Sequence, residues 1–129
     1  MPIRVVRLGF PRDPGEGLRL GTVRRPPRGV RAEDYASGDW YDVWLPELAP
    51  SAEVVRYAYA EEFTDRRWAT YARRYRAEMR RPPGARLIAL LAALSRRTSF
   101  SVGCYCEDPS RCHRSLLAEL LRDAGAEMR

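Results

Sequence analysis

Three short runs along the chain are rich in β-branched side chains or alternate apolar with other residues, which is typical of β-strands. They are IRVVRLGF at residues 3–10, LRLGTV at 18–23 and TSFSVGC at 98–104. In the third run Phe100, Val102 and Cys104 alternate with Ser101 and Gly103, as expected of a strand that buries one face. The pattern therefore predicts two strands near the N-terminus and one near the C-terminus.

Longer segments repeat their apolar side chains every three to four positions and predict amphipathic helices. Ser51 is a candidate N-cap of a helix that runs through about Glu62. Thr64 can cap the next helix, which ends before the Pro-Pro-Gly turn at 82–84. A broad apolar face over residues 85–97 predicts a third helix.

A fourth helix is expected to follow the last strand. Asp108 is its candidate N-cap, and Pro109 suits the first helical position. Leu116 and Leu117 would face inward, and Gly125 would end the helix.

This order of elements predicts a single α/β domain over residues 1–129, with a small, partly parallel sheet flanked by helices. A chain of 129 residues is long enough to bury one core. No apolar run approaches the roughly 20 residues that cross a bilayer, and the charged N-terminus does not resemble a secretory signal. We therefore expect a cytoplasmic protein without a membrane partner.

The charged residues indicate anionic partners. The net charge is +6, the isoelectric point is about 9.7, and all 23 basic residues are arginines. Arg24 and Arg28 lie in a proline-stiffened loop, RRPPRG, and are candidate ligands for an anionic small molecule. Nucleic acid is the alternative partner, although the arginines are spread along the whole chain.

The predicted junction between the last strand and the last helix gathers every cysteine and the only histidine. Cys104, Cys106, Cys112 and His113 fall within ten residues of sequence. An odd, clustered set does not resemble the spread, even-numbered cysteines of a disulfide-rich secreted domain. Because ligands of parallel α/β sheets bind beside the carboxyl ends of strands, this junction is the predicted functional site.

One interpretation of the junction is a metal site. Cys104, Cys106, Cys112 and His113 offer thiolate sulfur and imidazole nitrogen, which suit zinc or iron. The spacing is unusual for structural zinc, because a C-x-C pair and an adjacent Cys-His pair replace the common C-x₂₋₄-C pairs. Zinc or iron is therefore not the favoured interpretation, and the cofactor stays open.

The favoured interpretation is an anion-binding pocket at the start of the last helix, where backbone N–H groups and the helix dipole attract negative charge. Arg111 and Arg114 can add bidentate contacts. The same environment lowers the pKa of a nearby thiol, which makes Cys106 or Cys112 the candidate catalytic nucleophile. His113 is the candidate acid or base.

Other interpretations stay open. The three thiols could form a metal- or redox-sensing module, or the cysteines and His113 could be ordinary buried side chains. A non-catalytic nucleic-acid-binding module would account for the basic surface instead. The residues alone do not decide whether the protein is an enzyme.

Four stretches of the sequence resemble the domain of unknown function 488 (DUF488) family. GCYCEDPSRCHRSLL at 103–117 is similar to the C-terminal signature of the family. RGVRAEDY at 28–35, WLPELAPS at 44–51 and WATYARRYRAEM at 68–79 resemble one branch of it. Together these stretches span nearly the whole chain in the order found in the family.

The resemblance implies a compact α/β domain, found in bacteria or archaea, whose activity is unassigned. It supports a role for the Cys-His-Arg junction and for the arginines before Gly29, because family members carry matching motifs at both places. The branch usually has an acidic residue before the first arginine of that loop, where this chain has Val23. Members of the branch often lack the cysteines that this chain keeps, so the resemblance transfers no specific activity.

Overall fold

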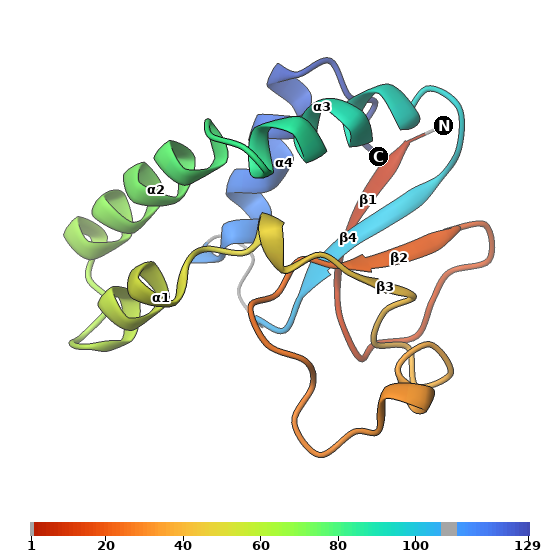
Figure 1. Cartoon of the computed structure of the whole chain (residues 1–129), viewed down its shortest axis with the longest axis horizontal. Helices are drawn as coiled ribbons and strands as arrows, with labels where there is room; N and C mark the ends of the chain where they lie inside the picture. Colours follow the sequence, from red (N-terminus) through yellow and green to blue (C-terminus); the bar gives the residue numbers. More distant parts are fainter. Residues whose placement is uncertain (1, 107–110) are drawn as a thin grey trace.

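Four parallel strands form one sheet in the order β1-β4-β2-β3 (Figure 1). They belong to a computed structural model that describes residues 2–106 and 111–129. β4, the strand expected near the C-terminus, lies between the two expected near the N-terminus. The predicted α/β fold is confirmed, and each pair of neighbouring strands is parallel. The strands are β1 (Ile3–Arg7), β2 (Leu18–Gly21), β3 (Val43–Trp44) and β4 (Phe100–Cys104).

The helices begin and end largely where local signals place them. Ser51 and Thr64 are N-caps, as predicted, and their hydroxyls accept the N–H groups of Val54 and Arg67. Gly125 follows the last helix with a φ of +92°, the left-handed conformation that commonly ends helices. The helices are α1 (Ala52–Tyr59), α2 (Asp65–Met79), α3 (Gly84–Leu94) and α4 (His113–Asp123).

The start of α4 differs from the prediction. Asp108 and Pro109, the expected cap and first residue, lie outside the described residues. The helix begins at His113, and Cys112 is its N-cap with an extended backbone (φ −135°, ψ 149°). Arg111, just before this N-cap, donates to the carbonyl of Phe63 in the connection between α1 and α2 at 2.9 Å. Cys112 and His113 are both buried. They do not share one helical face, because Cys112 precedes the helix and has an extended backbone.

The main core lies between one face of the sheet and the helices. Phe100 and Val102 of β4 point into it together with Leu20 of β2, which pairs directly with Val102. Tyr75 of α2 and Leu117 of α4 meet them there, and both are completely buried. Alternating apolar residues on the strands thus meet the apolar stripes of the helices, which is the arrangement that buries both.

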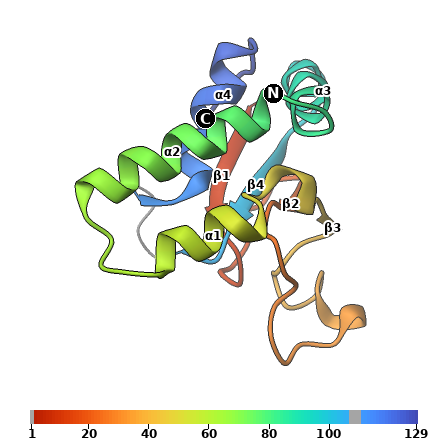
Figure 2. The same ribbon diagram turned by 60° about the vertical axis from the view of Figure 1, so that its left-hand side comes forward.

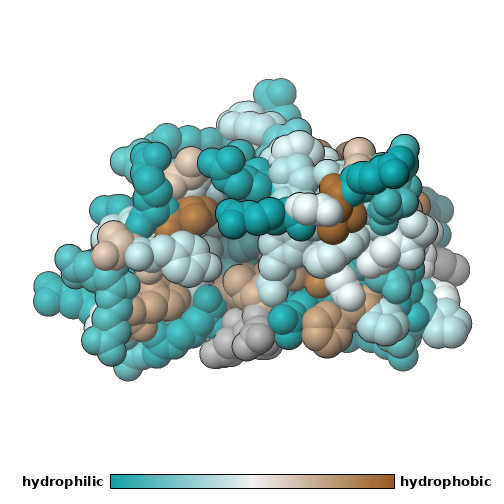
Figure 3. Space-filling model, turned by 90° about the horizontal axis from the view of Figure 1, so that it is seen from below, coloured by the Kyte–Doolittle hydropathy of each residue, from teal (hydrophilic) through white to brown (hydrophobic). Residues whose placement is uncertain are grey.

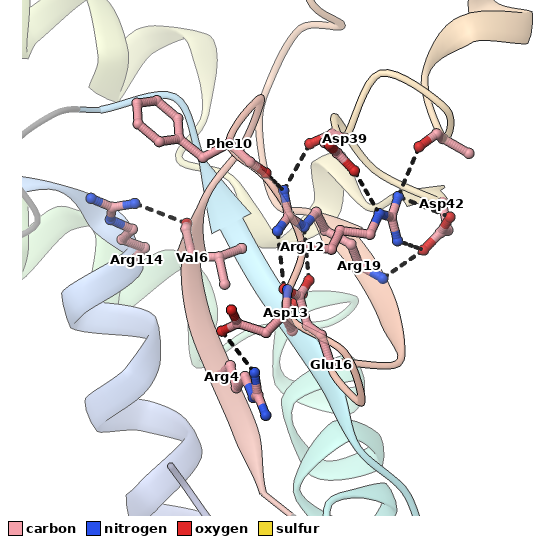
Figure 4. A network of polar contacts seen from close by, with 12 residues as sticks. Arg4, Val6, Phe10, Arg12, Asp13, Glu16, Arg19, Asp39, Asp42 and Arg114 are labelled. Atoms are coloured by element: carbon pink, nitrogen blue, oxygen red, sulfur yellow. Dashed lines mark hydrogen bonds and ion pairs between the residues drawn. The ribbon is translucent and has the colours of Figure 1, made fainter.

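The opposite face of the sheet carries a buried ion pair, shown with its neighbours in Figure 4. The side chains of Arg19 and Glu16 are only 1% and 3% exposed, and Nε lies 2.8 Å from Oε2. Ser101 of β4 donates a hydrogen bond to the same carboxylate at 2.7 Å. Arg19 also donates to the carbonyls of Phe10 and Asp39. The ion pair therefore ties two loops to the sheet.

Tertiary packing also brings together segments that are far apart in the sequence. α1 and α2 lie side by side and extend beyond the strands (Figures 1 and 2). The two ends of the trace lie close together (Figure 1), because Ile3 N–H donates to the carbonyl of Glu127 at 2.8 Å and Arg129 N–H donates to that of Ile3 at 2.9 Å. Within residues 2–106 and 111–129, none of the helices has both the length and the apolar character needed to cross a membrane.

Candidate functional site

A cavity of about 620 Å³ lies beside the carboxyl end of β4, the edge at which parallel α/β sheets bind ligands. Its lining comes from α1, from the segment after β2, and from residues 104–106 and 111–113. Cys104 and Cys112 are buried at its inner end, whereas Arg25 and Arg56 are exposed and mark its mouth.

The cavity wall is largely apolar. Val55 and Ala58 of α1 line one part of it, and Phe63 and Tyr71 line another. The phenol of Tyr71 is buried, and this burial raises its pKa well above the ordinary value, so the ring contributes no charge. An uncharged part of a ligand would therefore be favoured against this wall.

Three free thiols meet in the cavity. The sulfur atoms of Cys104, Cys106 and Cys112 all lie within 4.8 Å of one another. The sulfurs of Cys104 and Cys112 are hydrogen-bonded at 2.8 Å. Cys104 and Cys112 are buried, but Cys106 is partly exposed. The structure thus brings together at the cavity the three cysteines that the sequence singled out, and only Cys106 is partly exposed to solvent.

The three thiols differ in their pKa. Hydrogen bonds donated first by Cys104 and then by Cys112 lower the pKa of Cys106 to about 3, and the charge of Arg114 acts in the same direction. Donation to Cys106 raises the pKa of Cys104 to about 11. Hydrogen bonds to Cys104 and then Cys106 also raise the pKa of Cys112. At neutral pH the cluster therefore holds one thiolate, on Cys106, and two thiols.

His113 is held in one neutral form. Burial lowers its pKa below the ordinary value, so the ring is uncharged at neutral pH. Nε2 lies 2.5 Å from the carbonyl oxygen of Thr22, which can only accept, so Nε2 carries the hydrogen. Nδ1 is then a free acceptor that faces the Cys112 sulfur at 3.8 Å. Nδ1 and the Cys112 sulfur are thus adjacent, and in the reduced cluster the raised pKa of Cys112 and the lowered pKa of His113 keep the proton on the sulfur.

The two arginines predicted in the proline-rich loop lie in different surroundings. Arg24 lines the cavity, but its guanidinium donates to the carbonyls of Pro50 and Pro46, each at 3.1 Å, and of Ala49 at 3.3 Å. These bonds fix the segment that precedes α1. Arg28 is exposed and lies outside the cavity lining.

The two arginines predicted near α4 both make contacts within the protein. Arg111 lines the cavity and forms an ion pair with Asp65 at the start of α2. Arg114 is buried and donates to the carbonyl of Val6 at 2.8 Å (Figure 4) and to that of Cys106 at 3.0 Å. Arg114 therefore joins β1 to the residue that carries the thiolate, outside the cavity lining.

The three sulfurs are close enough to approach one soft metal ion. The 2.8 Å separation of Cys104 and Cys112 is shorter than the roughly 3.8 Å between two sulfurs on a tetrahedral zinc ion with Zn–S bonds near 2.3 Å. Zinc would thus require these sulfurs to move apart. His113 is not part of the sulfur group, and its Nε2 is already bonded to the carbonyl of Thr22.

Sequence reasoning missed two arginines at the cavity mouth. No hydrogen bond or ion pair joins the guanidinium of Arg25 or Arg56 to another residue within 2–106 and 111–129. Arg25 directly follows Arg24 in the sequence, and the sequence does not show which of the two guanidinium groups is left free at the cavity. Arg56 lies in α1, whose position across the cavity from β4 follows only from tertiary packing.

The surface seen in Figure 3, which lies below in Figure 1, is largely hydrophilic. Hydrophobic side chains are visible there only as separate spots between hydrophilic ones. In the described part of this face, no continuous hydrophobic area marks a docking surface.

Comparison with known proteins points to one family. Residues 3–125 match DUF488-N3a, described as the active DUF488-N3 subclade. The chain is 29% identical over 124 residues to the uncharacterized protein YeaO of Escherichia coli, covering 95% of this chain and 98% of that protein. It is 28% identical over 119 residues to the uncharacterized protein Rv3073c of Mycobacterium tuberculosis, covering 92% of each. No solved structure matches the chain significantly. As its motifs predicted, the chain belongs to the DUF488 family, in the active N3 subclade.

Proposed function

We propose that the protein binds an anionic small molecule in the cavity beside β4 and uses Cys106 as a nucleophile on it. One observation supports this most directly: a single cavity combines a partly exposed cysteine held by two thiol donors with two exposed arginines that have no described partner. Oriented guanidinium groups favour carboxylate and phosphate ligands.

Different residues bind the ligand and react with it. Arg25 and Arg56 hold the anionic group at the mouth, and the uncharged part of the ligand lies along Val55 and Phe63. Cys106 attacks from the inner end, where its sulfur accepts hydrogen bonds from its cysteine neighbours. This division assigns anion binding to different arginines from those that the sequence predicted.

The other three arginines hold parts of the cavity wall in position. Arg114 fixes the carbonyl of Cys106, and Arg24 fixes the carbonyls that precede α1. Arg111 holds the start of α2 near the cavity through Asp65. Because their guanidinium groups are already bonded to the protein, we assign these three residues to shaping the cavity.

The test compares two alkylating agents of similar size that differ in charge, because one carries a carboxylate where the other carries an amide. Iodoacetate is an anion and iodoacetamide is neutral, and each loses iodide as the cysteine sulfur bonds to its carbon. With an isolated thiolate the neutral reagent has the advantage, because like charges repel. We expect Cys106 to prefer iodoacetate, and we expect Arg25→Ala and Arg56→Ala each to reduce that preference severalfold.

Arg28→Ala is the matched control, because Arg28 is exposed and outside the cavity lining. It should leave the ratio of the two alkylation rates unchanged. A preference for iodoacetamide that none of the three variants alters would contradict the proposal. A preference that only Arg28→Ala removes would move the anion site to Arg28, outside the cavity lining.

A second candidate function is nucleic-acid binding, and one feature of α2 favours it. Arg66, Arg73 and Arg80 are exposed and recur every seven residues, so they lie along one side of this stretch. They span roughly 21 Å at 1.5 Å per residue. A row of this length could follow several phosphates of one strand.

This candidate predicts strongly salt-dependent binding. A variant with Arg66, Arg73 and Arg80 all changed to Ser should lower the slope of log affinity against log salt by about two to three. Fluorescence anisotropy with a labelled duplex and a labelled single strand measures it. Replacing Arg28, Arg97 and Arg122, which are exposed elsewhere, is the charge-matched control. Absence of binding at low salt rules this function out.

A further inference from the structure

The geometry of the cysteine cluster supports a reaction that needs no anionic substrate. Three sulfurs within 4.8 Å of one another are close enough for a disulfide to form with small shifts, since all three are free. We propose that Cys106 reduces a peroxide, and that Cys112 captures the oxidised sulfur as a Cys106–Cys112 disulfide. This activity goes beyond the proposed function and shares with it only the reactivity of Cys106.

Access selects the sulfur that reacts first. All three cysteines line the cavity, but only Cys106 is partly exposed, whereas Cys104 and Cys112 are buried. A small peroxide that enters the cavity therefore reaches Cys106 before the others. Hydrogen bonds from the two buried thiols favour the thiolate of Cys106, which is the form that attacks peroxides.

The first step oxidises sulfur by two electrons. The thiolate of Cys106 attacks one peroxide oxygen, a sulfur–oxygen bond forms, and the oxygen–oxygen bond breaks. The other oxygen leaves as hydroxide, or as alkoxide from an organic peroxide, and takes a proton from water. The product is a sulfenic acid on Cys106.

The second step forms the disulfide. The sulfur of Cys112 attacks the sulfenic sulfur, a sulfur–sulfur bond forms, and the sulfur–oxygen bond breaks. The proton of Cys112 passes to Nδ1 of His113, which faces that sulfur at 3.8 Å, and from there to the departing hydroxide, which leaves as water. Overall, one peroxide and two thiols give one alcohol or water, one disulfide and one further water.

His113 distinguishes Cys112 from Cys104 as the capturing thiol. Both cysteines contact Cys106, but only Cys112 has a neutral imidazole nitrogen beside its sulfur. Nε2 of His113 donates to the carbonyl of Thr22, so Nδ1 is fixed as the acceptor. Deprotonation of the capturing thiol is what the second step requires.

The experiment treats the fully reduced protein with one equivalent of hydrogen peroxide, blocks the remaining thiols with N-ethylmaleimide and digests with trypsin. Trypsin cuts after Arg97, Arg111 and Arg114, so Cys106 and Cys112 fall on different peptides. We expect a cross-linked pair of peptides 98–111 and 112–114 in which Cys104 carries the maleimide. Formation should be about tenfold faster than oxidation of free cysteine.

Variants separate the roles of the three sulfurs. Cys104→Ser should give the same cross-link, and Cys106→Ser should give none. Cys112→Ser should stop at a sulfenic acid that dimedone labels. A disulfide that survives in Cys106→Ser, or one contained within peptide 98–111, would overturn the proposal. So would an unmodified Cys106 in the native protein. The alkylation preference for iodoacetate is measured without peroxide, so the two proposals can fail separately.

Discussion

Cys106 is the residue at which the chemistry of the site is concentrated, and its pH dependence can be measured directly. Hydrogen bonds first from Cys104 and then from Cys112 lower its pKa to about 3, so the reactive thiolate persists until the pH falls towards that value. We expect its alkylation rate by iodoacetamide to be nearly constant from about pH 5 to pH 8. An ordinary thiol, with a pKa near 8.5, gains about tenfold per pH unit over much of that range.

Removing the donors provides the control for this prediction. Cys104→Ser and Cys112→Ser each exchange a thiol donor for a hydroxyl donor, whereas the double variant with alanine at both positions removes both donors. In the alanine variant the pKa of Cys106 should rise, and its alkylation rate should again increase with pH. Mass spectrometry that localises the label in peptide 98–111 distinguishes Cys106 from Cys104. A wild-type rate that increases tenfold per pH unit would be incompatible with this arrangement.

Arg114 is a second residue with a specific structural consequence. Its buried guanidinium donates to the carbonyls of Val6 and Cys106, so Arg114→Ala leaves two carbonyl groups without that donor. We expect the free energy of unfolding to fall by about 3 kcal/mol, measured by urea denaturation. Arg111→Ala removes an ion pair to an exposed Asp65 and one hydrogen bond to the carbonyl of Phe63, and should cost only about 1 kcal/mol. Equal losses in the two variants would contradict this assignment.

At the level of the structural elements, the buried ion pair decides how the loops are held on the sheet. Burial opposes ionisation of Glu16, but hydrogen bonds from Arg19 and Ser101 outweigh it and keep the pKa of that carboxyl below its ordinary value. Glu16→Gln leaves a buried Arg19 without its counter-charge and should lower the free energy of unfolding by about 3 kcal/mol at pH 7. Arg4→Ala, which removes a pair to an exposed Asp13 (Figure 4), should cost far less.

The pH dependence of this stabilisation has a definite sign. Because the pKa of Glu16 is lower in the folded state, ionised Glu16 stabilises the fold above about pH 4.3, the ordinary value for an unfolded glutamate. That contribution is lost as the pH falls from there through the folded value. The difference in unfolding free energy between wild type and Glu16→Gln should therefore shrink below about pH 4. A difference in unfolding free energy that stays constant from pH 7 to pH 3 would count against a lowered pKa of Glu16 in the folded state.

The elements that could be predicted are those with strong local signals. Ser51 and Thr64 cap their helices through their own hydroxyls, and the alternation in β4 identifies it as a strand. The expectation that β4 buries only one face is wrong, because this strand lies between two others and all five of its residues are buried. The start of α4 could not be placed, because its N-cap, Cys112, makes no side-chain capping bond. Arg19 alternates with leucines as a solvent-facing residue would, and its burial depends on a loop carboxylate that no strand pattern reveals.

At the scale of the whole molecule, the site also divides into residues that local sequence could identify and residues that only the fold brings in. The cysteines and His113 could be named because they are near one another in sequence, and the parallel sheet places that stretch at a ligand-binding edge. Arg56 comes from α1, and its place at the mouth depends on how α1 packs against α2 and the strands. Chemistry carried by one segment is thus visible in the sequence, whereas a site completed from several segments requires the fold.

The segment after α4 connects the last element to the first strand and makes a final prediction about global stability. Glu127 and Arg129 exchange backbone hydrogen bonds with Ile3, and Glu127 N–H also donates to the buried hydroxyl of Ser95 at 2.9 Å. Met128 packs against the core. Deleting residues 126–129 removes these bonds and that contact, and should lower the free energy of unfolding by about 3 kcal/mol in urea. Met128→Ala keeps the backbone bonds and should lose only about 1 kcal/mol. If the deletion costs no more than Met128→Ala, the backbone pairing with β1 contributes nothing to stability.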